Sequence, residues 1–220
     1  ALKANGIPAE ALNSGNDTKE FGLNEIKTDG IDAIIAADSG MDFLYENGVT
    51  PDIIVGDFDS TTTNALEYFE RKGQTEIRRL NPIKDDTDTE YAIRLAISEG
   101  ARSIVLLGAT GSRIDHVLGN ISLLGIGLES GTDISIIDTN NRIRMADKPV
   151  TIEKSAQYGR FVSLIALTDD NEVSLKGFKY PVTDYSFDRF TSLGISNEIV
   201  DDHALIDIHR GKFIIIESKD

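Results

Sequence analysis

Three short apolar runs constrain the fold of this chain more than any other feature. They are "IDAIIAADSG" at 31–40, "PDIIVGD" at 51–57 and "SIVLLGATG" at 103–111, and each is closed by Gly or Asp. Because they lack the alternation of a half-exposed strand, they predict buried parallel strands. Helical patterns lie between them, and a strand that alternates with a helix indicates an α/β sheet with crossover helices.

The clearest helical pattern is "TDTEYAIRLAISEG" at 87–100. Thr87 and Glu90 fit a capping box at its start, and Gly100 fits the left-handed position that ends many helices. In contrast, the polar stretch "NSGNDTKEFG" at 13–22 is expected to be an ordinary loop.

The sequence changes character after about Asn140. The runs "VTIEK", "FVSLIAL", "EVSLKGF" and "HALIDIHRGKFIIIES" predict short strands, and no convincing helix follows. Strands without helices after an α/β region favour a second, small antiparallel β-sandwich. We therefore expect a parallel-sheet domain over 1–139 and a β-sandwich domain over 140–220.

The charge balance excludes several classes of partner. The chain of 220 residues has 22 Lys and Arg against 37 Asp and Glu, a formal net charge of -15 at pH 7. Such a field repels nucleic acid and anionic membranes, and it repels a nucleotide polyphosphate unless a divalent cation intervenes. The chain has no cysteine, so thiol chemistry and thiolate zinc sites are excluded. The first residues lack the features of a signal peptide, and no stretch has the length of a membrane span, so a cytoplasmic location is expected.

Acidic residues follow the predicted strands at the points where the strands end. Asp38 follows the first run, and Asp57 and Asp59 follow the second. The carboxyl ends of parallel strands meet at one edge, so these acids are expected to converge there. In an extended backbone the spacing of Asp57 and Asp59 places both carboxylates on one face, and Asp86 and Asp88 form a second pair. Mg²⁺ prefers such oxygen ligands and often shares them with substrate phosphates.

The segment "GATGSRIDH" at 108–116 is suited to phosphate oxygens. Its glycine-rich turn offers backbone N–H groups and leads into a predicted helix start, and Arg113 adds a forked cation. His116 could donate to a phosphate, hold Asp115 in place, or serve only as a structural residue. Any one of the acids at the predicted strand ends, taken alone, would be interpreted as a turn residue or a helix cap. Their convergence with a glycine-rich turn on one predicted edge favours a phosphoryl-transfer site.

Four blocks of the chain resemble, in order and at similar spacing, the signature of the thiamine pyrophosphokinase family. They are "AADSG", "PDIIVGDFDS", "KDDTDTEYA" and "GATGSRIDHVLGNI". The second half continues the resemblance with "FVSLIAL", "GFKYPV" and "GISNE", so that it covers nearly the whole chain.

The resemblance implies transfer of a pyrophosphoryl group from ATP to the hydroxyethyl oxygen of thiamine, with Mg²⁺ bound and AMP as the second product. It also implies an α/β nucleotide-binding domain, a β-sandwich that binds thiamine, and a homodimer with shared active sites. The catalytic residues that it implies are Asp57, Asp59, Asp86, Asp88 and Arg113, with the four acids as metal ligands. The ATP-site residues are Asp38, Ser39, Gly108, Thr110, Gly111, Ser112, Arg113, Asp115 and His116. The thiamine-contacting pair is Ser196 and Asn197.

Two departures from the family pattern leave the first strand and the residue that stacks on thiamine open. The apolar first strand of the family is poorly represented in "ALKANGIP", and the chain has no Trp to pack against the thiamine rings. Aromatic side chains of the second half could take that role, because a thiazolium cation binds favourably to an aromatic face. The candidates are Tyr180, Tyr185, Phe187 and Phe190, although an aromatic residue in a β-sandwich is more often part of the core. His203 and His209 are expected to be structural.

Two other function classes remain open at this point. A metal-dependent glycosyltransferase would use an Asp-x-Asp pair to hold a nucleotide-sugar, but it leaves "KDDTDTE" and "GSRIDH" without a role. A non-catalytic nucleotide sensor would bind its ligand without turnover. The density of carboxylates beside a phosphate site disfavours the sensor.

Overall fold

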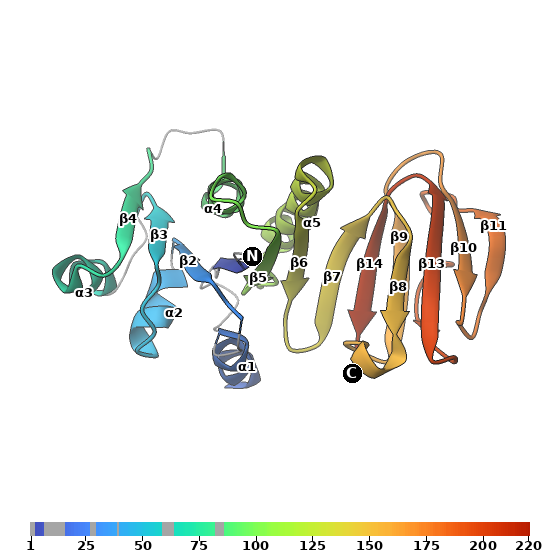
Figure 1. Cartoon of the computed structure of the whole chain (residues 1–220), viewed down its shortest axis with the longest axis horizontal. Helices are drawn as coiled ribbons and strands as arrows, with labels where there is room; N and C mark the ends of the chain where they lie inside the picture. Colours follow the sequence, from blue (N-terminus) through green and yellow to red (C-terminus); the bar gives the residue numbers. More distant parts are fainter. Residues whose placement is uncertain (1–2, 7–15, 27–29, 39, 59–63, 82–85) are drawn as a thin grey trace. The chain divides into compact units, whose positions relative to one another are not determined.

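The computed structural model describes residues 3–6, 16–26, 30–38, 40–58, 64–81 and 86–220 (Figure 1). The chain divides into two compact units, Ala1–Thr139 and Asn140–Asp220. Among the described residues, none of the helices is both long enough and apolar enough to cross a membrane.

The first unit contains a parallel sheet. Its strands in the described residues are β1 (Lys3–Gly6), β2 (Ala33–Ala37), β3 (Ile53–Gly56), β4 (Glu76–Arg79), β5 (Ser103–Leu107) and β6 (Asp133–Ile137). They lie in the order β6-β5-β1-β2-β3-β4, and the pairings along this order are all parallel. The chain runs outward from β1 to β4 and then returns to the other side of β1 with β5. The order therefore reverses at β1, and the crevice beyond the carboxyl ends of β1 and its neighbours is where such sheets bind ligands.

Helices cover both faces of this sheet. They are α1 (Asn16–Ile26), α2 (Gly40–Glu46), α3 (Ala65–Lys72), α4 (Asp88–Ser98) and α5 (Ile114–Ser130). Figure 1 shows α4 and α5 on one side of the sheet and α1, α2 and α3 on the other. On the latter side, Met41, Leu44 and Phe69 are fully buried in one cluster with Ile54 of β3. Burial contributes about 1.5–3 kcal/mol for each such side chain, so this cluster anchors α2 and α3 to the strands that carry the acids.

Both ends of α4 follow the sequence signals. The Thr87 side chain accepts a hydrogen bond from the Glu90 backbone N–H at 3.2 Å, as the capping box predicts. The Glu90 carboxylate, however, accepts from the Arg94 guanidinium at 2.7 Å. At the other end, Gly100 has a φ of 90°, and the next N–H, that of Ala101, donates to the Ala96 carbonyl at 2.9 Å. The start of α4 is thus fixed at the residues that hold the second acidic pair.

In the first 26 residues one expectation is corrected, and the open question of the first strand is answered. The stretch at 13–22 was expected to be a loop, but α1 begins at Asn16. Its apolar face lies near its end, where Ile26 is buried and Phe21 and Leu23 pack against the same cluster. The weakly apolar start nevertheless forms β1, because β1 pairs with a strand on each side and so satisfies its backbone without an apolar run.

The second unit contains two antiparallel sheets. Its strands are β7 (Asn141–Ala146), β8 (Val150–Glu153), β9 (Phe161–Ala166), β10 (Glu172–Lys176), β11 (Val182–Ser186), β12 (Asn197–Glu198), β13 (His203–Arg210) and β14 (Phe213–Ser218), with a 3₁₀ turn at Lys154–Ala156. One sheet has the order β12-β9-β14-β7 and the other β11-β10-β13-β8. A single apolar cluster takes side chains from both sheets, including Val162, Leu164, Val173, Ile206 and Phe213. The broad α/β prediction for the chain is confirmed, with a helix-free second unit apart from the short 3₁₀ turn.

One end of this core is ionic. Glu217 on β14 is fully buried, and its two carboxylate oxygens accept four hydrogen bonds. Arg142 on β7 binds both oxygens at 2.9 and 2.7 Å, Arg144 donates at 2.8 Å, and the backbone N–H of Tyr158 donates at 2.9 Å. Three charged side chains therefore replace an apolar layer where β7 pairs with β14.

Candidate active site

The backbone turns through left-handed conformations directly after three strands of the first unit, β2, β3 and β5. Asp38 after β2 has a φ of 46°, Phe58 after β3 has a φ of 62°, and Gly108 after β5 has a φ of 70°. Such angles are costly for residues other than glycine, and they cluster at functional sites. Gly56 allows the close approach there, since a Cβ atom on it would lie 3.1 Å from the Phe58 ring and 3.3 Å from the Asp38 Cα atom.

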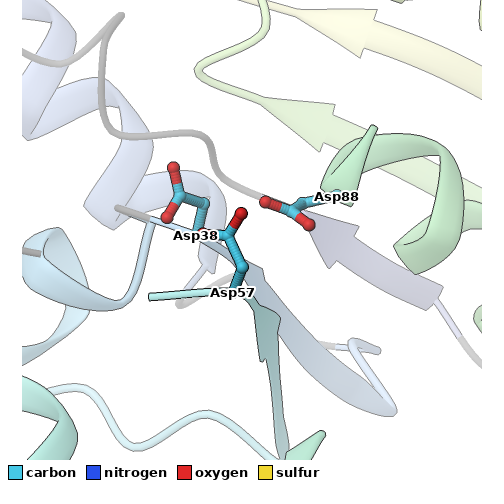
Figure 2. Close-up of side chains that lie close together, drawn as sticks. All are labelled: Asp38, Asp57 and Asp88. Carbon is cyan, nitrogen blue, oxygen red and sulfur yellow. The ribbon is translucent and has the colours of Figure 1, made fainter. Parts of the chain in front are cut away.

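The side chains of Asp38, Asp57 and Asp88 lie close together at this edge (Figure 2). One carboxylate oxygen from each lies within 4.8 Å of the other two, and each side chain is half-buried. Asp38 follows β2, Asp57 follows β3, and Asp88 is the first residue of α4. Three like charges at such separations repel one another in a partly desolvated site, and a hard divalent cation relieves this repulsion. The donor set is all oxygen, so the trio fits Mg²⁺ or a similar cation.

The trio overlaps with the expected acids but is not the same set. Asp38 was expected beside the phosphates, and the structure places it with the metal-capable acids. Asp86, which precedes α4, is exposed and is not a member of the trio. Asp59 and Ser39, which were also predicted, lie outside the described residues. The extended backbone expected between Asp57 and Asp59 is wrong, because Phe58 adopts the left-handed conformation.

The glycine-rich turn lies between β5 and α5. Within the predicted ATP-site segment Gly108, Gly111 and Thr110 are half-buried, whereas Ser112, Arg113, Asp115 and His116 are exposed. The Arg113 guanidinium donates to both carboxylate oxygens of Asp115, at 3.2 Å from Nε and 2.6 Å from Nη2. This fork fixes the direction of the cation at the start of α5.

The hydrogen bond from Arg113 lowers the pKa of Asp115 to about 2. Because the folded-state pKa lies below the ordinary value of 3.8, the pair favours the folded protein above that value and loses this contribution as the pH falls through about 2. We expect an Asp115 titration midpoint near pH 2 by carboxyl ¹³C NMR, and a return toward 3.8 in Arg113→Gln. Arg102→Gln, a control at an exposed arginine, should leave the midpoint unchanged, and a wild-type midpoint near 3.8 would contradict the pairing.

The second unit carries the predicted thiamine-contacting pair in a tightly built segment. Ser196 is exposed with a φ of 60°, and its N–H donates to the Ser163 hydroxyl at 3.0 Å. Asn197 is 6% exposed, and its side-chain amide binds the backbone of Tyr180 through two hydrogen bonds, from the Tyr180 N–H at 3.0 Å and to the Tyr180 carbonyl at 2.9 Å. The Asn197 amide thus holds Tyr180, which is a role that the sequence alone did not indicate.

The four candidate aromatic side chains differ in exposure. Tyr180 is 62% exposed and Phe190 is 90% exposed. Phe187 belongs to the core and packs edge-to-face on Phe213 at 5.8 Å between ring centroids, and Tyr185 packs on Phe187 at 5.2 Å. Tyr180 and Phe190 are therefore better placed than Phe187 to stack on a ligand.

A metal-capable trio of acids and a glycine-rich turn with a fixed arginine are the parts that phosphoryl transfer requires. Comparison with known proteins agrees with this class. Residues 27–136 match the model of the thiamin pyrophosphokinase catalytic domain, and residues 149–213 match that of the thiamin pyrophosphokinase vitamin B1 binding domain.

Individual relatives match over most of their length. The thiamine pyrophosphokinase of Bacillus subtilis is 34% identical over 188 residues, which cover 84% of this chain and 87% of that protein. Among solved structures, the B. subtilis thiamine pyrophosphokinase superposes with a TM-score of 0.87 at 30% identity, over 99% of each chain. The Geobacillus thermodenitrificans thiamin pyrophosphokinase has a TM-score of 0.81 at 28% identity, over 100% of this chain and 97% of that one. This chain belongs to the thiamine pyrophosphokinase family, which is a family of ATP-dependent diphosphotransferases.

Proposed function

We propose that this protein transfers the pyrophosphoryl group of ATP to thiamine at the acidic edge of the first unit. The observation that carries the proposal is the trio of Asp38, Asp57 and Asp88, whose carboxylate oxygens lie within 4.8 Å of one another. The net charge of -15 opposes the binding of a nucleotide polyphosphate, and a divalent cation held by this trio would offset that repulsion.

In the proposed reaction, the hydroxyethyl oxygen of thiamine forms a bond to the β-phosphorus of ATP. The bond from that phosphorus to the oxygen bridging the α- and β-phosphates breaks, and this oxygen leaves with AMP. Asp38, Asp57 and Asp88 would hold Mg²⁺, with Asp59 and Asp86 as further proposed acids, and bound Mg²⁺ neutralises charge on the polyphosphate. Arg113 stabilises charge on the transferring group, and a carboxylate of the edge accepts the proton of the thiamine hydroxyl late in the step.

The second unit is proposed as a β-sandwich that binds thiamine. Ser196, with its strained backbone, presents its hydroxyl to the substrate, and the exposed ring of Tyr180 faces the cationic thiazolium. Homodimer formation with shared active sites and a cytoplasmic location stay predictions.

The link between Asn197 and Tyr180 gives a test of the thiamine site. Asn197→Ala removes both side-chain hydrogen bonds to the Tyr180 backbone, so we expect the KM for thiamine to rise about 10-fold while the KM for ATP stays within about twofold. In a Tyr180→Ala background the same change should add little, since both variants act through one ring. Effects that multiply in the double variant would show instead that Asn197 acts independently of Tyr180.

The activity itself is tested with purified protein, ATP, Mg²⁺ and thiamine. We expect AMP and thiamine diphosphate in equal amounts, and neither product when thiamine or the metal is left out. Folded protein that forms no AMP under these conditions would overturn the proposed function.

A further inference from the structure

Two side chains from outside the glycine-rich turn hold two successive residues inside it. The Nδ2 of Asn120, in α5, donates to the Ala109 carbonyl at 2.9 Å. The Thr110 hydroxyl donates to Oδ2 of Asp138, which follows β6, at 2.8 Å. Asn120 and Asp138 have no part in the reaction described above, although they tie the turn to a helix on one side and to a strand end on the other.

The bond from Asn120 orients the peptide unit between Ala109 and Thr110, and the bond to Asp138 holds the Thr110 side chain. A trans peptide is planar, and its C=O and N–H groups point in opposite directions. Because Asn120 draws the Ala109 carbonyl toward α5, the N–H of Thr110 is turned away from α5. The Ala109 side chain is 2% exposed, which resists rotation of the turn as a whole.

The hydrogen bond from Thr110 to Asp138 also limits what the Thr110 hydroxyl can offer to a ligand. Since that hydroxyl donates its proton to Asp138, it presents to a ligand only its oxygen lone pairs, which phosphate oxygens do not accept. The contact of Thr110 with an anion must therefore come from its backbone N–H. An N–H group that is held in one orientation is a favourable donor to a phosphate because no reorganisation is needed on binding.

We propose that Asn120 and Asp138 are positioning residues for the nucleotide, which orient the N–H of Thr110 toward the polyphosphate of ATP. The proposal rests on the proposed function, in which this turn binds ATP. It predicts a selective effect: contacts with the phosphate chain are weakened when the turn is released, while the chemistry of the transfer and the binding of thiamine are unchanged.

Kinetics of the full-length protein separate this role from a general loss of structure. Asn120→Ala and Asp138→Ala should each raise the KM for ATP about 5- to 20-fold, with kcat and the KM for thiamine within about twofold of wild type. Asp138→Asn keeps an oxygen that accepts from Thr110 and removes a negative charge near the phosphates, so its KM for ATP should equal or fall below that of wild type. A rise in KM for Asp138→Asn as large as that for Asp138→Ala would overturn the role of Asp138.

The N–H group itself is observed by ¹H–¹⁵N NMR with a non-hydrolysable ATP analogue and Mg²⁺. We expect the Thr110 amide proton to shift downfield on binding in the wild type, and to shift much less in Asn120→Ala at matched saturation. AMP, which lacks the β- and γ-phosphates, should bind to the wild type and to Asn120→Ala with the same affinity. If the wild type forms AMP and thiamine diphosphate but the Thr110 resonance does not respond to the analogue, the positioning proposal fails alone. If the wild type forms neither product, the proposed function fails.

Discussion

Asp57→Asn is expected to lower turnover about 100-fold or more without destabilising the protein. The substitution keeps the shape of the side chain and removes one of the three charges that converge within 4.8 Å. Charge stabilisation by a bound metal is worth several kcal/mol in such reactions, and each 1.36 kcal/mol corresponds to a factor of ten in rate. Without metal, removal of one like charge relieves repulsion, so the unfolding temperature of the variant should equal or exceed that of wild type.

The matched control is Asp133→Asn. Asp133 is exposed and begins β6, at the edge of the sheet opposite to the trio, so this variant changes the net charge equally. It should retain wild-type turnover. Thermal unfolding with and without Mg²⁺ completes the test, because a ligand that binds only the folded protein raises its stability, and this rise should be lost only in Asp57→Asn. An active Asp57→Asn variant with an intact Mg²⁺ response would contradict the assignment of the trio.

Glu217→Gln is expected to lower the free energy of unfolding by about 3 kcal/mol, because the loss of the buried carboxylate leaves the half-buried guanidinium groups of Arg142 and Arg144 without their anion. The carboxylate accepts four hydrogen bonds from Arg142, Arg144 and Tyr158, and its side chain has no exposed surface. A neutral amide would leave both guanidinium groups without their anion and would oppose a donor with a donor. Urea denaturation followed by circular dichroism measures the change.

Glu153→Gln provides the comparison on the same unit. Glu153 ends β8 and is exposed, so the same chemical change there should alter stability by less than about 0.5 kcal/mol. If Glu217→Gln changed the free energy of unfolding as little as this control, the ionic end of the core would contribute little to the stability of the fold.

Part of the fold could be predicted because several strands of the first unit are short apolar runs without polar alternation. The runs that contain β2, β3 and β5 are of this kind, and the Thr87 cap marks the start of α4. β7 was not predicted, because its "NRIRMA" sequence has arginines at the positions that face the core. Their acceptor, Glu217, is about 75 residues away in the sequence, so only the folded pairing of β7 with β14 explains them.

The candidate site, too, could be predicted from the sequence only in part. The acids could be found from the sequence because they follow strand ends, and parallel strand ends share an edge. The membership of the trio could not, since it depends on the left-handed turns at Asp38 and Phe58, and neither residue type signals such a turn strongly. The contacts of Asn120 with Ala109 and of Asp138 with Thr110 were also beyond the sequence, because both partners lie outside the glycine-rich turn.

In the proposed reaction, thiamine attacks the β-phosphorus of ATP. The most direct test uses ATP with ¹⁸O in the bridge between the α- and β-phosphates, incubated with the protein, Mg²⁺ and thiamine, and mass spectrometry of the products. Attack at the β-phosphorus predicts all of the bridging ¹⁸O in AMP and unlabelled thiamine diphosphate in equal amount. Formation of ADP, or of labelled pyrophosphate, would exclude attack at the β-phosphorus.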